Sequence, residues 1–473
     1  RHLGGDAAAK LLHAGCWAAG GLAVAALARD RVGAGAAPWA FALHLTLPLG
    51  MVVASRAYVE HFLVLPLLAA LLVLLPAPRA RSALLLAGWL AGAAAGTKYL
   101  GGALVILLLV WIVRRGLPAR AAVWFAAGAA AAGGYWYVRN ALWTGNPVFP
   151  VLFGGPHWTP ADMAGWRGDA RAFELHATTL LTAPWSLLRD PTGDGGLSPV
   201  LMTAAAAPLL WPAVRRDPLW GLVLALVVTW WITSPLPRYL VPALALCAAA
   251  SAAFLHRGPL TRGSAGRNTT AAMMLAGIVG SLACGVQAIQ GGTMPYETAL
   301  GKLDPREYRR EYFRPRGFVE MLESVERRVP PRGRAYLLGH LFSYDLPRRV
   351  WFEFLYTRPA LYWWLRGADS AERIAARARQ AGLTHLVYQP LGARAILGPH
   401  PERMDWTPAL RRAYASFWRR HVTEEERLGT WVIYRIERRP GRHPLPAGTL
   451  PGTEGAGPAT SLKAGPEPGR GAR

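Results

Sequence analysis

The chain has 473 residues, of which 52% are hydrophobic and only 17% are charged, and its formal net charge is +24. Apolar residues fill positions 1 to about 290 in stretches of helix length, which indicates a membrane part and not a soluble enzyme there. The arginines cluster beside these stretches, so membrane topology explains much of the charge and no nucleic-acid partner is expected. The three cysteines all lie in apolar stretches, which excludes a disulfide framework or a thiolate metal site.

About ten of the apolar stretches are long enough to be expected as membrane spans, some of them shortened by burial within protein. They cover roughly residues 7–28, 34–54, 61–77, 83–97, 100–113, 120–138, 197–214, 218–233, 237–255 and 271–290.

Arginine-rich segments occupy alternate gaps between these spans. They are Arg29–Arg31, Arg79–Arg81, Arg114–Arg120, Arg215–Arg216 and His256–Arg267. Short arginine-rich loops stay on the cytoplasmic side, so the other gaps and everything from residue 291 onward are expected on the extracytoplasmic side. This pattern predicts a multi-pass membrane protein. Because the chain opens with Arg1 and enters an apolar stretch after Asp6, we also expect an upstream part.

The composition divides the chain into three regions. Residues 1–290 form the membrane part, and residues 291–440 mix charge, aromatic residues and short apolar runs as a water-soluble domain does. Residues 441–473 are mostly small residues, proline and scattered charge, which predicts a disordered tail. The predicted fold is therefore mainly α, a polytopic transmembrane helical bundle followed by a small extracytoplasmic α/β domain.

Four strands and one helix are predicted in the second region. The strands are Arg334–Gly339, Arg349–Phe354, Thr384–Gln389 and Thr430–Ile436, and the helix lies between Ser370 and Gly382. No phosphate-binding loop, zinc helix or nucleophile elbow occurs in this region, so we expect it to bind or position an acceptor rather than to carry out chemistry.

Lys98 lies in the middle of the stretch from Arg81 to Arg114, where Gly96, Gly101 and Gly102 interrupt the apolar run. Both ends of this stretch carry cytoplasmic arginines, so it must cross and return. Each arm spans only roughly 22 Å as a helix, which holds Lys98 at or just below the outer interface. A cation there either binds an anionic ligand or extends to the lipid headgroups.

Arg56 and Glu60 lie in the gap between the second and third expected spans. They are four residues apart and could pair on a helix. Alternatively, Glu60 is a carboxylate that points into a cavity as an acid, a base or a metal ligand.

The longest outer gap begins at Arg139 and Asn140 and continues through Gly145, Asn146 and two prolines. Glycine and proline predict a turn followed by an extended segment at the membrane surface. Such a long loop between spans usually has a function.

Arg238 and Tyr239 follow two prolines at the outer start of a span. The guanidinium of Arg238 could either anchor the span at the interface or clamp a phosphate with two parallel hydrogen bonds. Together with Lys98 and Arg139 it gives three cations on the outer face. This set suits a membrane-anchored phosphate better than a neutral solute.

In this order the motifs resemble those of the GT-C fold, the polytopic glycosyltransferases that include protein mannosyltransferases and aminoarabinose transferases. The similarity covers most of residues 6–440. It depends on five segments, Ala9–His13, Ala57–Glu60, Gly96–Tyr99, Arg139–Pro150 and Arg238–Pro242.

The resemblance implies a glycosyltransferase, either a hexosyl- or a pentosyltransferase, that uses a polyprenyl-phosphate-linked sugar donor. It would transfer the sugar to a lipid, glycan or protein acceptor on the extracytoplasmic face of a bacterial inner (plasma) membrane. In such enzymes a carboxylate of the first outer loop is the expected main catalytic group, and the first span and that loop would precede this chain.

Specific roles are expected for nine residues. Lys98, Arg238 and Arg139 would bind the donor phosphate, and Glu60 would act as catalytic acid or base, or as a ligand of a divalent metal. The supporting residues would be Arg56, Tyr99, Asn140, Asn146 and Tyr239. Two alternatives remain, a transporter or flippase for lipid-linked sugars and a non-catalytic accessory protein.

Overall fold

The computed structural model describes residues 5–56, 58–155, 218–233, 236–257, 263–292, 296–312, 316–340, 349–352, 359–397 and 406–443, with single residues between some of these ranges. The chain divides into two compact units, Arg1–Leu300 and Gly301–Arg473. The expected span 197–214, most of the outer loop before it and the tail from residue 444 lie outside the described residues.

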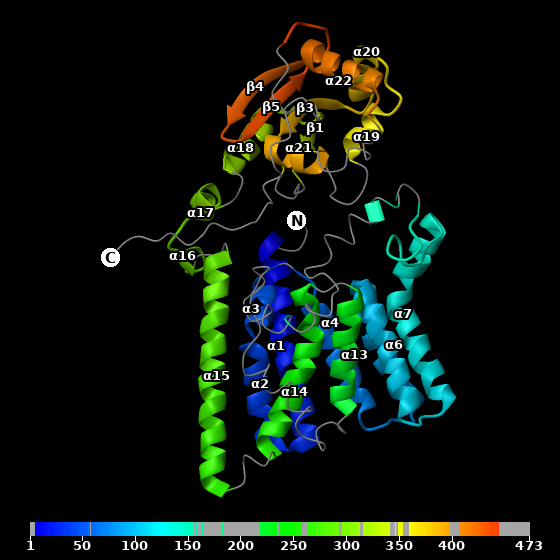
Figure 1. Ribbon diagram of the computed structural model, residues 1–473, viewed down its shortest axis with the longest axis vertical. Coiled ribbons are helices and arrows are strands. Elements are labelled where there is room, and N and C mark those ends of the chain that lie inside the picture. Colours follow the sequence, from blue (N-terminus) through cyan, green and yellow to red (C-terminus); the bar gives the residue numbers. More distant parts are fainter. Residues whose placement is uncertain are drawn as a thin grey trace. The chain divides into compact units, whose positions relative to one another are not determined.

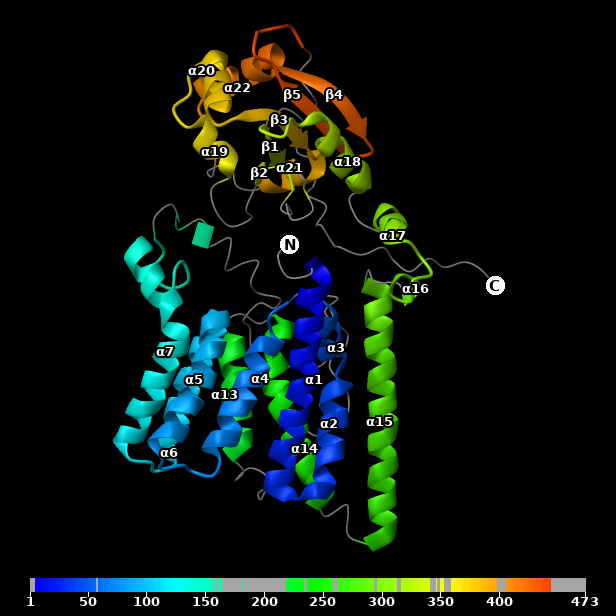
Figure 2. The ribbon, with the colours of Figure 1, turned by 180° about the vertical axis from the view of Figure 1, so that it is seen from behind.

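The first unit is helical throughout its described part (Figures 1 and 2). Its elements are α1 (Gly5–Val32), η1 (Ala34–Ala36), α2 (Ala37–Leu45), α3 (Pro48–Ser55), α4 (His61–Leu74), α5 (Arg81–Thr97), α6 (Tyr99–Arg114), α7 (Ala119–Thr144), α13 (Pro218–Thr233), η2 (Pro237–Leu240), α14 (Val241–Arg257), α15 (Gly263–Gly292) and α16 (Tyr296–Ala299).

Few of these helices are long enough to cross a membrane unaided. Within the described residues, Ala8–Val32 and Gly263–Gln290 meet the length and apolarity of a span, and Ala34–Leu45 with Pro48–Ser55 adds a third if this bent pair counts as one. The expectation of about ten full spans is therefore not met there. Helices do lie at each expected position that is described, but α4, α6 and α13 are shorter apolar helices.

The predicted span 34–54 is broken because of Pro48. Leu47, before the proline, is extended at φ −62° and ψ 115°, and Pro48 opens α3. A residue before proline is driven out of the helical region, and proline itself suits the first turn of a helix. The two halves bend by 58° at this point.

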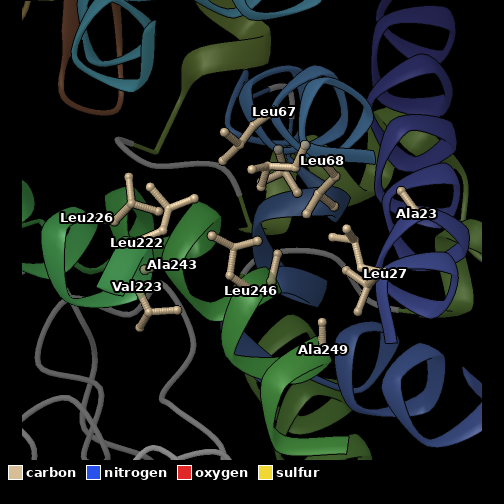
Figure 3. Close-up of a cluster of buried hydrophobic side chains, with 14 of the residues drawn as sticks. Ala23, Leu27, Leu67, Leu68, Leu222, Val223, Leu226, Ala243, Leu246 and Ala249 are labelled. Carbon is tan, nitrogen blue, oxygen red and sulfur yellow. The ribbon is translucent and has the colours of Figure 1, made fainter. Parts of the chain in front are cut away.

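The core of the first unit is aliphatic and joins helices that are far apart in the sequence. Figure 3 shows side chains of α1, α4, α13 and α14 meeting there. Leu27, Leu68 and Leu246 have no exposed surface. Burying one such side chain stabilises a fold by about 1.5–3 kcal/mol when the alternative is water.

Helices α5 and α7 pack so closely that only glycine fits between them. A Cβ added at Gly88 would lie 1.9 Å from the carbonyl oxygen of Phe125, and one at Gly92 would lie 2.3 Å from that of Ala129. On the other helix, a Cβ at Gly128 would lie 2.2 Å from the carbonyl oxygen of Leu85. Small residues bring membrane helices into backbone contact in this way, so α5 is fixed against α7 along its length.

The second unit contains a five-stranded mixed sheet. Its described elements are α17 (Pro305–Tyr312), α18 (Phe318–Arg328), β1 (Arg334–Leu338), β2 (Arg349–Phe352), α19 (Ala360–Leu365), α20 (Ala371–Gln380), β3 (Leu383–Tyr388), α21 (Pro390–Leu397), α22 (Pro408–His421), β4 (Val422–Leu428) and β5 (Trp431–Ile436). The strand order is β2-β1-β3-β5-β4. Strand β1 pairs in parallel with β2 and β3, whereas β5 pairs antiparallel with β3 and β4.

Helices cover both faces of this sheet. Alternate residues of each strand point to opposite faces, so Tyr336 packs with α19, α20 and α22 while Leu337 packs with α18. The predicted α/β architecture of this region is confirmed, and β1, β2, β3, β5 and α20 lie where the sequence predicts strands and a helix. Strand β4 was not predicted. Its three consecutive glutamates, Glu424–Glu426, do not alternate with apolar residues, because it is the edge strand next to β5.

Replacing a contact glycine should loosen the first unit. We expect Gly128→Ala to lower the free energy of unfolding by about 1–3 kcal/mol, since the new Cβ overlaps a backbone carbonyl that cannot move alone. Thermal unfolding in detergent would measure the change. The control is Gly134→Ala on the same helix, where the nearest atom would be 4.0 Å away. This variant should be neutral or gain up to about 1 kcal/mol from helix propensity. Equal destabilisation of both variants would contradict the close packing.

The second unit should lose stability in acid partly through His421. Its side chain is buried at 3% exposure, and this burial lowers the pKa of His421. A backbone hydrogen bond with Glu437 and the charge of Glu372 raise the pKa, whereas the charges of Arg420 and Arg379 lower it further. Above the ordinary value of 6.5 both states are neutral there. At lower pH the unfolded chain takes up a proton that the folded state resists, so the free energy of unfolding falls.

His421→Gln removes this titration. Between about pH 7.5 and about pH 5 the variant should lose less stability than the unmodified chain, measured by tryptophan fluorescence during unfolding. An identical loss in both would show that His421 does not contribute.

Candidate functional site

Glu60 is a buried carboxylate at the start of α4, with 1% of its surface exposed. It follows the turn after α3 and directly precedes His61, the first residue of α4. One carboxylate oxygen, Oε2, accepts a hydrogen bond from the backbone N–H of Val59 at 3.1 Å. A buried carboxylate is stable as an anion only if it is paired and hydrogen-bonded.

Lys98 supplies the first cation. It lies in the break between α5 and α6 with an extended backbone, at φ −160° and ψ 150°. Its Nζ donates to Oε1 of Glu60 at 2.9 Å, and its side chain remains 28% exposed. The predicted break in this stretch is thus found, and the lysine at its centre points to Glu60. An ammonium group has three N–H donors, so the exposed part of Lys98 can still reach a ligand.

Arg238 supplies the second cation from η2. Its Nε lies 3.6 Å from the same Oε1 of Glu60, and its side chain is 25% exposed. One carboxylate therefore holds two cations from segments distant in the sequence, and the three side chains together carry a net charge of +1. The two cations are partly exposed, so the group can attract an anion that Glu60 alone would repel.

Aromatic rings flank the two cations. The Nζ of Lys98 lies 3.8 Å from the ring centre of Tyr239. The guanidinium of Arg238 lies 5.1 Å from the ring of Tyr58, which also has Arg56 at 5.8 Å on the preceding turn. Cation–π attraction at such distances restricts the cations without neutralising them.

The alternative of a helical pair between Arg56 and Glu60 is wrong. Helix α3 ends at Ser55, and Arg56 is extended at φ −101° and ψ 157°. The two residues therefore do not share a helix, and the ion pairs of Glu60 go to Lys98 and Arg238.

His13 of α1 fixes the segment that carries Glu60. Its Nε2 accepts the backbone N–H of His61 at 3.1 Å, so its Nδ1 bears the proton and donates to the carbonyl of Arg56 at 3.1 Å. The histidine thus holds both ends of the turn 56–61. Sequence reasoning assigned no role to His13, since a single histidine in an apolar helix carries no signal of what it contacts.

A second polar network joins α6, α7 and the segment that follows them. Asn140 donates to the hydroxyl of Tyr99 at 2.8 Å, and this hydroxyl donates to the carbonyl of Phe149 at 2.6 Å. Asn146 is 2% exposed and closes the turn by bonding Gly154 and Val148. Three of the expected supporting residues therefore hold this segment in place.

The segment after α7 differs from its prediction in two ways. Helix α7 continues to Thr144 and ends at Gly145 with φ 72°, so Arg139 and Asn140 lie on the helix and not in the loop. Residues 147–153 form successive turns rather than an extended stretch, because Asn146 accepts and donates hydrogen bonds across them.

Arg139 does not join the Glu60 group in the described part of the chain. Its guanidinium lies 3.9 Å from the ring centre of Trp143 and 5.3 Å from that of Trp136. These rings stand one helical turn after and one turn before it on α7, where side chains meet. The expected trio of cations is therefore a pair with a separate third member.

Metal ligands do not gather among the described residues, where no group of three or more histidine, cysteine, aspartate or glutamate side chains could hold an ion. Glu60, the expected ligand, is occupied by Lys98 and Arg238.

The helical first unit and the small α/β second unit give the chain the GT-C fold. The structure is similar to that of ArnT from Cupriavidus metallidurans in the apo state, with a TM-score of 0.53 and 16% identity over 90% of this chain and 83% of that chain. ArnT bound to undecaprenyl phosphate matches with a TM-score of 0.49 and 16% identity, over 90% and 83% of the two chains.

The oligosaccharyltransferase of Archaeoglobus fulgidus in the apo form matches with a TM-score of 0.46 and 13% identity, over 94% of this chain and 64% of that chain. The sequence itself matches no protein-family profile and no curated protein. The fold and the apolar helices together make the chain a membrane protein.

Substitutions in the Glu60 group should show that Glu60 and Lys98 stabilise the fold together. We expect Glu60→Gln to lower the free energy of unfolding by about 1–3 kcal/mol, because two cations then face each other without their carboxylate. Lys98→Gln combined with Glu60→Gln should cost less than the sum of the single changes, as measured by thermal unfolding in detergent. Arg120→Gln, an exposed cation at the start of α7, is the control. Strict additivity would show that Lys98 and Glu60 act independently.

Proposed function

We propose that this protein is an integral-membrane glycosyltransferase that moves a sugar from a polyprenyl-phosphate-linked donor to an acceptor. The reaction would take place on the extracytoplasmic face of a bacterial plasma membrane. The alternation of arginine-rich gaps supports this side, and the GT-C fold supports the class.

The observation that carries the proposal is the pair of partly exposed cations held by one buried carboxylate. Lys98 and Arg238 keep 28% and 25% of their side-chain surface, while Glu60 is buried. Such a group favours an anion with several oxygens, and a lipid phosphate at the membrane interface has this chemistry. ArnT, whose fold this chain shares, binds undecaprenyl phosphate.

The chemistry follows from charge. An acceptor hydroxyl or amine attacks the anomeric carbon, the bond to the phosphate oxygen breaks, and the lipid phosphate leaves with growing negative charge. Fixed cations stabilise this charge more in the transition state than in the bound donor. Lys98 and Arg238 would supply that stabilisation.

The same geometry supports a positioning role for Glu60. Its Oε1 faces both cations and its Oε2 accepts the N–H of Val59, so it is not placed to take a proton from an acceptor. We propose that it holds Lys98 and Arg238 in register, with His13 holding the turn that bears it. The proton of the acceptor would then be taken by a group outside the described residues.

The experiment is sugar transfer by the full-length protein in lipid nanodiscs, with a panel of undecaprenyl-phosphate-linked hexoses and pentoses and with binding of undecaprenyl phosphate measured in parallel. Lys98→Gln should weaken lipid phosphate binding by at least about tenfold, the loss of one charge-assisted hydrogen bond. Arg120→Gln is the matched control and should bind as the unmodified chain does.

The outcomes separate the competing functions. Transfer that falls together with binding in Lys98→Gln supports the glycosyltransferase. Binding without transfer from any donor, together with movement of the lipid between leaflets, would replace it with a flippase. Binding that is unchanged in Lys98→Gln would overturn the phosphate site itself.

A further inference from the structure

The second unit contains a cavity of about 600 Å³ whose lining is strongly basic. Four arginines contribute to it, together with a serine and a histidine. These are Arg412, Arg419, Arg420, Arg442, Ser416 and His443. The lining includes no aspartate or glutamate, so the charge of the cavity is not balanced from within.

One wall is a face of α22. Arg412, Ser416 and Arg419 follow one another at intervals of four and three residues, which places them on one side of the helix. The opposite side, with Phe417 and Trp418, has no exposed surface and packs into the core of the unit. The helix is thereby held with its basic face outward.

The other wall is the segment 441–443, which is attached to the end of α22. The backbone N–H of Gly441 donates to the carbonyl of Arg420, and that of His443 to the carbonyl of Arg419, both at 2.7 Å. The His443 ring lies 3.2 Å from the hydroxyl of Thr423 through Nε2. Arg442 is therefore held between two anchored residues, and it contributes to the lining of the cavity.

Three of the four arginines of this cavity have no ion pair with another described residue. Arg420 pairs with Glu372 of α20. Within the described part of the chain, Arg412, Arg419 and Arg442 have no carboxylate partner. Like charges that line one cavity raise its electrostatic potential and attract a counter-ion. Guanidinium groups bind phosphate oxygens in pairs, with a geometry that lysine does not provide.

We propose that this cavity binds a phosphate or diphosphate group of a ligand, held by Arg412, Arg419 and Arg442. The site is separate from the Lys98 and Arg238 pair and does not depend on the proposed transfer reaction. It gives the second unit a ligand of its own, although the sequence of this unit contains no phosphate-loop motif.

The test is binding of radiolabelled inorganic pyrophosphate to the full-length protein in phosphatidylcholine nanodiscs at low salt. Arg419→Gln combined with Arg442→Gln should weaken this binding at least about tenfold, or remove one equivalent of bound pyrophosphate. The matched control is Arg332→Gln, an exposed arginine of the same unit that is not part of the lining. Equal thermal unfolding of both proteins would show that the loss is not one of folding.

Two further arms identify the source of the phosphate. Short-chain phosphatidic acid and glucose 1-phosphate are compared as competitors, and the stronger one distinguishes a lipid headgroup from a soluble phosphorylated compound. The double variant is also compared with Arg332→Gln in a Lys98→Gln background, where the donor site is already weakened; the same loss of pyrophosphate binding there separates this cavity from the donor site. Pyrophosphate binding that is the same in the double variant as in Arg332→Gln would overturn the proposal.

Discussion

The candidate site depends on one buried charge, the carboxylate of Glu60. Without it, Lys98 and Arg238 would repel each other, and the break of α5 and α6 would keep only the contact of Lys98 with the ring of Tyr239 among its described contacts with η2. With it, three segments meet at a single pair of oxygen atoms. A buried carboxylate is unfavourable unless it is paired, so the burial of Glu60 in the bundle depends on the two cations.

Two sets of contacts hold the helices and the turn around this charge in place. The contact of α5 with α7 passes largely through glycine and backbone, and Tyr137 of α7 adds a hydrogen bond from its hydroxyl to the carbonyl of Ala95. On the opposite side His13 binds both ends of the turn 56–61. The two cations stand at the edge of the group and keep part of their surface exposed.

Local patterns predicted elements well and contacts poorly. Apolar runs located the helices, and alternating residues located four strands, because burial imposes a short period on the sequence. The break at Lys98 was predicted from glycines and charge at both ends. The partners of Lys98 were not, since Glu60 and Arg238 lie far away in the sequence and no local period links them.

The misplaced Arg139 shows the opposite case, in which a local signal was present. Trp143 stands four residues after it and Trp136 three before, at the spacing of neighbours on a helix, and α7 had only to continue a little past its expected end. Strand β4 could not have been found in this way, because its glutamates face arginines of α18 and β5 rather than a core.

The backbone groups of Lys98 are hydrogen-bonded to both helices at the break. The direction of its side chain therefore depends on the number of residues in α5. Its N–H bonds to the carbonyl of Ala94 and its carbonyl accepts the N–H of Gly101, so neither helix end is left open. Each residue of a helix turns the chain by about 100°. One residue added to α5 would therefore aim Lys98 at a different side of the bundle, whereas one added to α6 after Gly101 would leave it where it is. The reach of this cation toward a ligand is set by the length of a single helix.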